Sequence, residues 1–218
     1  MACMPVLNFR SRDHDTQNWN IFLFRSGISS SIDLVIAVDS ATNVSPESLS
    51  AVKNMLKNLL KSYNVSAPRT NVGLVTFGRT ATVKLQLSTG VNKSLVERAI
   101  EEIQKQQGPR NIERALYQAR NMLLDKKRTE KRKEAAKQVL LVVTGGRSGA
   151  KEPRLQNLAR AMINEGIRPI VLAVDVTDAK DLSSLVKTRE DIIINDNAKE
   201  LAKVLGDIEK RSGKAAGE

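Results

Sequence analysis

The sequence predicts an α/β fold: a three-layer, doubly wound and mostly parallel sheet with one antiparallel edge strand. Segments 32–38 and 138–144 are almost continuously apolar and rich in β-branched residues, which is typical of strands buried on both faces. Segments with apolar residues at helical spacing alternate with such strands along the chain. This alternation indicates a parallel sheet that is covered by helices on both sides.

The first strand and the first helix follow from local signals. Residues 32–38 read IDLVIAV, and the helix expected over 46–63 carries apolar residues at helical spacing. Ser45 is a suitable N-cap, and Pro46 is favoured at the first position of a helix. A buried strand followed by an amphipathic helix is therefore expected here.

The next two strands, 71–77 and 80–87, are expected to form a hairpin that turns at Gly78 and Arg79. Apolar and polar residues alternate along 80–87, which is typical of a half-exposed strand. This segment is expected to supply the antiparallel edge of the sheet.

The rest of the chain continues the alternation. Gly108 and Pro109 separate two expected helices, and Gly166 is the expected C′ residue of a third. The remaining elements are expected as helices 93–103, 112–124, 155–165, 179–186 and 198–210 and as strands 138–144, 167–174 and 191–195.

One domain is expected over residues 31–210. Residues 1–30 hold three of the four phenylalanines and the single tryptophan without lasting periodicity, so we expect an N-terminal extension there. Residues 211–218 are expected to form a flexible tail. In open sheets of this kind, ligands bind outside the carboxyl ends of the strands. The loops expected at that edge are 39–43, 108–111 and 145–148.

The composition excludes several classes of function. Lys and Arg number 35 against 24 Asp and Glu, and the net charge of +11 favours polyanionic partners. The single cysteine, Cys3, excludes an internal disulfide or a cysteine zinc site, and the single histidine, His14, excludes a multi-histidine metal centre. Aromatic residues are 3% of the chain, so we expect no base-stacking surface and no nucleic-acid partner. No enzyme is expected, because no nucleophile with an adjacent base is recognisable.

The sequence leaves the cellular compartment open. Arg10, Arg12 and Asp13 interrupt the mildly apolar N-terminus before an export signal develops. No apolar stretch approaches the ~20 residues that span a bilayer, so no membrane span is expected. The chain is expected either to stay inside the cell or to be a fragment of a longer, exported protein.

Five segments together carry a resemblance to a known family. They read IDLVIAVDSATNV, NVGLVTFG, NIERALYQA, QVLLVVTGGRS and IRPIVLAV. In this order and spacing they resemble a von Willebrand factor type A domain over roughly residues 31–210, and VVTGGRS resembles the collagen-VI-like and matrilin-like members. The resemblance implies the fold derived above and a role in adhesion.

The resemblance also implies a divalent cation, commonly magnesium, at the carboxyl ends of the strands. The family pattern supplies Asp-x-Ser-x-Ser from the first loop, a Thr from a second loop and an Asp after the fourth strand. Asp39 matches the first Asp, but Ala41 and Asn43 stand at the two Ser positions. Arg110 falls near the Thr position, and Gly145 falls at the second Asp position. Because one carboxylate and one amide make a poor magnesium site, we expect a degenerate site with no metal and no cofactor.

An unpaired carboxylate at a buried strand end is costly, so Asp39 needs a partner. One hypothesis is that Arg110 or Arg147 pairs with it, a guanidinium standing in for the metal. The alternative is that Asp39 accepts N–H groups of its own loop while both arginines point to solvent.

The densest run of charge lies at 126–133, where six of eight residues are basic. It predicts a site for a heparin-like polysaccharide or, alternatively, a nuclear-import signal, although a solvated helix end explains it as well. The candidate residues are Lys126, Lys127, Arg128, Lys131, Arg132 and Lys133.

Three tripeptides match the N-glycosylation pattern, at Asn43, Asn64 and Asn92. About two are expected by chance in a chain of this composition, so they identify candidate sites without indicating secretion.

These observations favour a non-enzymatic protein-interaction or adhesion module of the extracellular matrix, which binds a protein ligand without a divalent cation. An extracellular, secreted location is preferred. Two alternatives stay open: an intracellular scaffold in the nucleus or cytoplasm, and a metal-dependent adhesion domain.

Overall fold

A computed structural model describes residues 31–61, 63–125, 132, 136–146, 152–176 and 180–194. Its six strands are β1 (Ile32–Asp39), β2 (Thr70–Phe77), β3 (Ala81–Leu85), β4 (Lys137–Thr144), β5 (Ile167–Ala173) and β6 (Ile192–Ile194). They form one sheet in the order β3-β2-β1-β4-β5-β6. All neighbours are parallel except β2 and β3, so β3 is the antiparallel edge strand.

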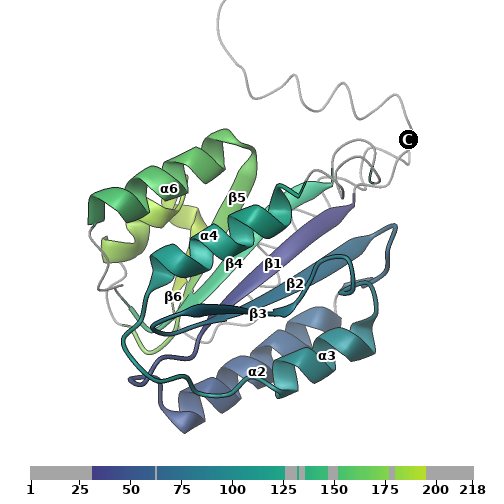
Figure 1. Cartoon of the computed structure of the whole chain (residues 1–218), viewed down its shortest axis with the longest axis horizontal. Coiled ribbons are helices and arrows are strands. Elements are labelled where there is room, and N and C mark those ends of the chain that lie inside the picture. The colour runs from purple at the N-terminus through teal and green to yellow at the C-terminus, as the bar shows by residue number, and fades with distance from the viewer. Residues whose placement is uncertain are drawn as a thin grey trace, which may run out of the picture.

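Helices cover both faces of the sheet (Figure 1). They are α2 (Pro46–Lys61), α3 (Lys93–Glu101), α4 (Ile112–Leu123) and α6 (Glu152–Asn164), with 3-10 helices η1 (Lys180–Leu185) and η2 (Arg189–Asp191). The α2 and α3 helices pack on one face, and α4 and α6 pack on the other. The predicted three-layer α/β class is therefore confirmed.

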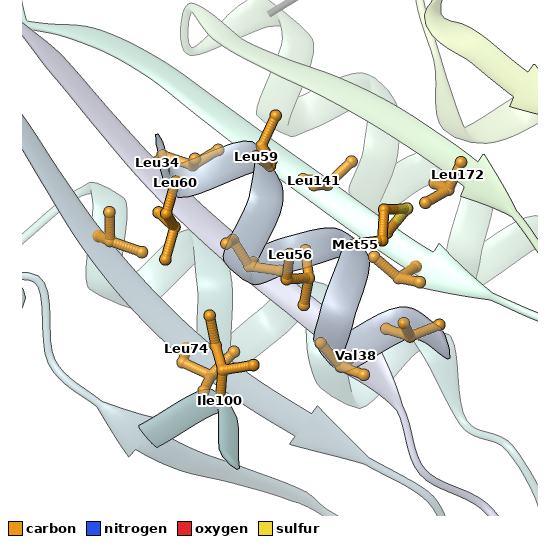
Figure 2. Close-up of a cluster of buried hydrophobic side chains, with 14 of the residues drawn as sticks. Leu34, Val38, Met55, Leu56, Leu59, Leu60, Leu74, Ile100, Leu141 and Leu172 are labelled. Carbon is orange, nitrogen blue, oxygen red and sulfur yellow. The ribbon is translucent and has the colours of Figure 1, made fainter. Parts of the chain in front are cut away.

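Two hydrophobic cores fill the space between the sheet and its helices. Successive residues of a strand point to opposite faces, so β1 contributes to both cores. Leu34 and Val38 lie in one core with Leu56 of α2 (Figure 2). Val35 and Ala37 lie in the other core, beneath α4 and α6. Because β1 is buried on both faces, its end is held rigidly at the centre of the molecule.

Short polar side chains cap the N-termini of α2, α3 and α4. The backbone N–H of Ser48 donates to Oγ of Ser45 at 3.0 Å, which confirms the predicted N-cap of α2. Asn92 caps α3 by accepting from N–H of Ser94 at 2.9 Å, and Asn111 caps α4 in the same way. These two caps were not predicted, although asparagine is among the preferred N-cap residues.

Several element boundaries differ from the sequence prediction; β3, for example, covers only Ala81–Leu85 of the predicted 80–87, and α3 ends at Glu101. The helix predicted over 179–186 is the shorter 3-10 helix η1, and its Leu182 and Leu185 are both buried. The strand predicted over 191–195 is shortened to β6, since η2 precedes it. The α6 helix begins three residues before the predicted start. The predicted helix 198–210, the N-terminal extension and the tail lie outside the described residues.

Candidate functional site

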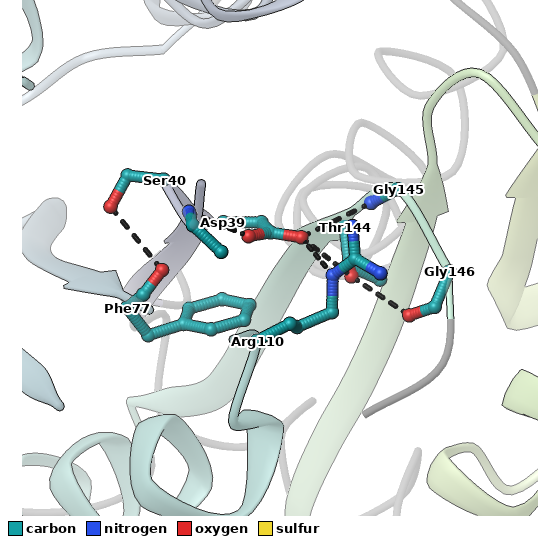
Figure 3. A network of polar contacts seen from close by, with 8 residues as sticks. Asp39, Ser40, Phe77, Arg110, Thr144, Gly145 and Gly146 are labelled. Carbon is teal, nitrogen blue, oxygen red and sulfur yellow. Dashed lines mark hydrogen bonds and ion pairs between the residues drawn. The ribbon is translucent and has the colours of Figure 1, made fainter. Parts of the chain in front are cut away.

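The candidate site lies where β1 and β4 end, at the centre of the sheet's carboxyl edge. Asp39 is the last residue of β1, and Thr144 is the last residue of β4. Because β1 and β4 run parallel in register, their ends lie side by side. Arg110 reaches the same place from the segment that precedes α4 (Figure 3). Three segments far apart in the sequence therefore meet at one carboxylate.

Four donors surround the Asp39 carboxylate. Oδ1 accepts the backbone N–H of Ala41 at 3.1 Å. Oδ2 pairs with Nε of Arg110 and also accepts from Oγ1 of Thr144 at 3.2 Å and N–H of Gly145 at 3.4 Å (Figure 3). Three of the four donors contact Oδ2 and one contacts Oδ1, so both oxygens of the carboxylate are hydrogen-bonded within the chain.

Both hypotheses about Asp39 hold in part. Pairing with an arginine is confirmed, and the arginine is Arg110. The N–H of Ala41 adds the bond from the carboxylate's own loop that the alternative required. The other candidate, Arg147, lies outside the described residues.

The pair of Asp39 and Arg110 is buried. Their side chains are 3% and 9% exposed, respectively. A charge taken out of water is costly unless it is paired, and breaking such a pair costs about 3–5 kcal/mol. Each of these two residues therefore depends on the other for its place in the fold.

Gly145 makes room for the guanidinium. A Cβ placed on this glycine would lie 3.0 Å from Nη2 of Arg110, which is tighter than an ordinary contact. The neighbouring Gly146 has a φ of +128°, and a Cβ there would lie 3.6 Å from Nη1. The absence of side chains at both positions lets Arg110 lie against the backbone after β4.

The residues at this edge do not fit a magnesium ion. The Asp39 carboxylate already accepts from four donors, one of them cationic. Ala41 is fully buried and carries a methyl group where the family has a hydroxyl. Gly145 offers an N–H where the family has a carboxylate. A small hard cation requires several oxygen ligands, and this arrangement presents a guanidinium instead.

A cavity of about 180 Å³ opens beside the pair. It is lined by Asp39, Asn43, Val44, Ser48, Val52, Arg110, Val143, Thr144, Gly145, Val174 and Asp175. Ser48 of α2 donates to the carboxylate of Asp175, which joins the first helix to the segment after β5. Asn43 is exposed on the loop after β1 and lines the same cavity as Asp39.

Several contacts at this edge were not predicted. Oγ1 of Thr144 reaches Asp39 and also the carbonyl of Gly146, at 3.1 Å. Ser40 donates its hydroxyl to the carbonyl of Phe77 at 3.2 Å, which ties the end of β1 to the end of β2. A polar residue that directly follows an apolar strand is the only signal in the sequence for these contacts.

Only Arg132 of the predicted polyanion site lies within the described residues. Nη1 of Arg132 lies 3.1 Å from Oδ1 of the buried Asp33, and its side chain is 15% exposed. Its guanidinium also donates to the carbonyls of Ala67, at 3.2 Å, and Arg69, at 3.0 Å. Arg132 therefore anchors the start of β1, and its part in a polyanion site stays a prediction. The lysines and Arg128 of this run lie outside the described residues.

Asn43, Asn64 and Asn92 are all exposed. The side-chain oxygen of Asn92 accepts the N–H groups of Ser94 and Leu95, so this amide caps α3. Within the part of the chain that the structure describes, no helix is long and apolar enough to cross a membrane.

Fold, strand order and the site at the carboxyl edge together define the class of protein. Residues 33–208 match the family model of the von Willebrand factor type A domain. The chain therefore belongs to this family, as the resemblance in its sequence implied.

Collagen VI chains and a matrilin are among the proteins with similar sequences. The human collagen alpha-6(VI) chain is 26% identical over 187 residues, which are 86% of this chain and 8% of the collagen chain. Mouse matrilin-2 is 25% identical over 154 residues, which are 70% of this chain and 16% of matrilin-2. This chain thus spans less than a fifth of either relative.

Among solved structures, proximal thread matrix protein 1 from the mussel byssus, with a zinc-occupied MIDAS motif, is similar with a TM-score of 0.69. The identity is 21%, over 84% of this chain and 46% of the mussel chain. At this identity the likeness establishes the fold alone.

Proposed function

We propose that this domain is a non-enzymatic adhesion module of the extracellular matrix, which binds a protein ligand without a divalent cation. The relatives in collagen VI and matrilin-2 support the matrix role and an extracellular location. The observation that carries the cation-independent part is the ion pair between Arg110 and Asp39.

The ion pair supports this proposal through charge. In a metal-containing site a cation neutralises the first carboxylate and leaves a position for an acidic group of the ligand. Here the guanidinium of Arg110 supplies the positive charge from within the chain. The protein ligand is then bound by surface contacts with the loops at the carboxyl edge of the sheet. Removing divalent ions has no effect on this binding.

A binding role is also favoured over catalysis. Among the described residues, no group of three or more His, Cys, Asp or Glu side chains could hold a metal ion. The polar side chains at the edge are held in mutual contacts, as Thr144 and Asp39 are. A general base needs a substrate proton within hydrogen-bond reach, and Asp39 is enclosed by donors of its own chain.

A metal-dependent adhesion domain is the second candidate, because the similar mussel protein has a zinc-occupied motif. Calorimetric titration with Mg²⁺, Mn²⁺ and Zn²⁺ separates the two candidates. We expect no saturable binding and the same melting temperature in Mg²⁺ and in EDTA. A rise in melting temperature with any of these ions would support the second candidate.

A restored variant serves as the positive control. Ala41→Ser, Asn43→Ser, Arg110→Thr and Gly145→Asp together return the family pattern around Asp39. We expect this variant to bind Mg²⁺ and to melt at a higher temperature in its presence. Binding of Mg²⁺ to this variant would show that the assay detects a metal ion at the carboxyl edge of the sheet when the metal ligands are present.

Ligand binding is tested by surface plasmon resonance against purified collagens and laminin. We expect binding to at least one of them, with the same affinity in Mg²⁺ and in EDTA. Binding that is lost in EDTA contradicts cation independence, and no binding to any of them contradicts the matrix role.

A further inference from the structure

A second, larger groove lies beside the antiparallel edge of the sheet. It has a volume of about 860 Å³ and is formed by the turn between β2 and β3, by β3 itself and by the loop that follows α3. Its lining residues are Thr42, Arg79, Thr80, Thr82, Lys84, Gln106, Gln107 and Gly108. None of them lines the cavity at Asp39, so the two sites are distinct.

The groove is cationic and polar. Two of its lining residues, Arg79 and Lys84, are exposed cations, and none of the eight is acidic. Thr82 and Lys84 are two residues apart on β3, so they point to the same side of the strand. Lys84 on β3 and Arg79 in the turn before it place positive charge at a strand that has no neighbour in the described sheet on its outer side.

The walls of the groove are held in place before any ligand arrives. The backbone N–H of Gly108 donates to Oγ1 of Thr42 at 2.8 Å, and N–H of Thr42 donates back to the carbonyl of Gly108 at 3.2 Å. Nε2 of Gln106 donates to Oγ1 of Thr76 at 2.8 Å. These bonds join the loop after α3 to the ends of β1 and β2, so little ordering is needed on binding.

Gly108 also fixes the position of Arg79 in the groove. Its φ is +94°, and a Cβ on it would lie 2.8 Å from both Cβ and Nε of Arg79. The stem of Arg79 therefore lies directly against the backbone of Gly108. A side chain at position 108 would displace the arginine from the groove.

We propose that this groove binds a sulfated polysaccharide. Sulfates pair with Arg79 and Lys84, while the hydroxyls of the sugar form hydrogen bonds with the hydroxyl and amide side chains of the lining.

Other classes of ligand fit the groove less well. A peptide is disfavoured, because interface energy comes mainly from aromatic and apolar anchors in pockets and the lining has no apolar side chain. A single-stranded nucleic acid is disfavoured, because no aromatic ring lines the groove for stacking. The net charge of +11 assists the encounter with any polyanion.

The test is binding of a size-defined heparin oligosaccharide to the full chain, measured by calorimetry at low salt. The double variant Arg79→Ala/Lys84→Ala is compared with Lys187→Ala/Arg189→Ala. The control removes one Lys and one Arg, also exposed, from the segment that leads to β6 at the opposite edge of the sheet. We expect the groove variant to weaken the Kd at least about tenfold, since two charge-assisted contacts are lost, and the control to change it little. Equal losses in the two variants would overturn the proposal.

Two further measurements test whether the groove is the binding site and whether a polysaccharide is the ligand. Backbone amide shifts in NMR spectra on addition of the oligosaccharide should concentrate at Thr80, Thr82 and Gln106. Shifts confined to the basic run at 126–133 would overturn the groove as the site. Poly-glutamate should compete weakly, and competition as strong as that of heparin would overturn the polysaccharide as the ligand.

Discussion

The guanidinium of Arg110 lies against Gly145, where a Cβ would come within 3.0 Å of Nη2. The glycine clears a space at the end of β4, and the arginine uses that space to reach the carboxylate of Asp39. An aspartate at position 145 would place its Cβ in this tight contact, so the guanidinium would have to shift. The two departures from the family pattern, a glycine for an acid and an arginine near a threonine position, are therefore parts of one arrangement.

Arg110→Ala should destabilise the fold severely. It leaves the carboxylate of Asp39, 3% exposed, without its cation, and we expect a loss of about 3–5 kcal/mol in the free energy of unfolding. Urea denaturation followed by circular dichroism measures this loss. Adding Asp39→Asn removes the unpaired charge, so the double variant should recover part of the stability. An Arg110→Ala variant as stable as the parent would show that the pair is not needed.

Gly108→Ala should destabilise the protein more than Gly166→Ala. Both glycines have positive φ, +94° and +85°, so each substitution carries a backbone strain of about 1–3 kcal/mol. At Gly166 nothing lies within 4 Å of the added Cβ, whereas at Gly108 the methyl group meets Arg79. Thermal melts of the two variants measure the difference, and equal losses would contradict the close contact between Gly108 and Arg79.

The stability of the contact between α4 and α6 should depend on pH. Nε of Arg120 donates to Oε2 of Glu165 at 2.7 Å, and this hydrogen bond, together with the charge of Arg120, lowers the pKa of Glu165. A lowered folded pKa means that the stabilisation is present above the ordinary glutamate pKa of about 4.3 and is lost as the pH falls through the lower folded value.

Glu165→Gln tests this dependence. The effect should be modest, because both side chains are about one-third exposed and water screens the pair. We expect the variant to melt at a slightly lower temperature than the parent at pH 7, and the two to converge as the pH falls below about 4. A difference that stays constant down to pH 2 would contradict the assignment.

Arg132→Ala should lower stability as well as charge. Its guanidinium pairs with the buried Asp33 and donates to two backbone carbonyls, so we expect a loss of about 1–3 kcal/mol. Arg98→Ala, at an exposed position of α3, removes the same charge and should cost little. Chemical denaturation of both variants makes the comparison. Equal stabilities would mean that Arg132 belongs to the solvated basic run, as its sequence neighbours suggested.

Local patterns in the sequence determined most of the fold. A strand buried on both faces must be apolar at every position, and an amphipathic helix repeats its apolar residues every three or four positions, so β1, β4 and α2 could be predicted within a few residues. The Ser45 cap could also be predicted, because its donor and acceptor are only three residues apart in the sequence. The family and its altered positions, Ala41 and Gly145 among them, also follow from sequence alone.

The tertiary structure decided which distant groups meet. Asp39 and Arg110 are 71 residues apart, and the sequence offered Arg147 as an equal partner. In the sequence, Arg132 is one of six basic residues in the run 126–133, and nothing there indicates that it pairs with Asp33. The groove at Arg79 and Lys84 combines three segments that share no motif. Local periodicity determines which face of an element is buried, but only the packing of the sheet brings charges on separate loops within hydrogen-bonding distance.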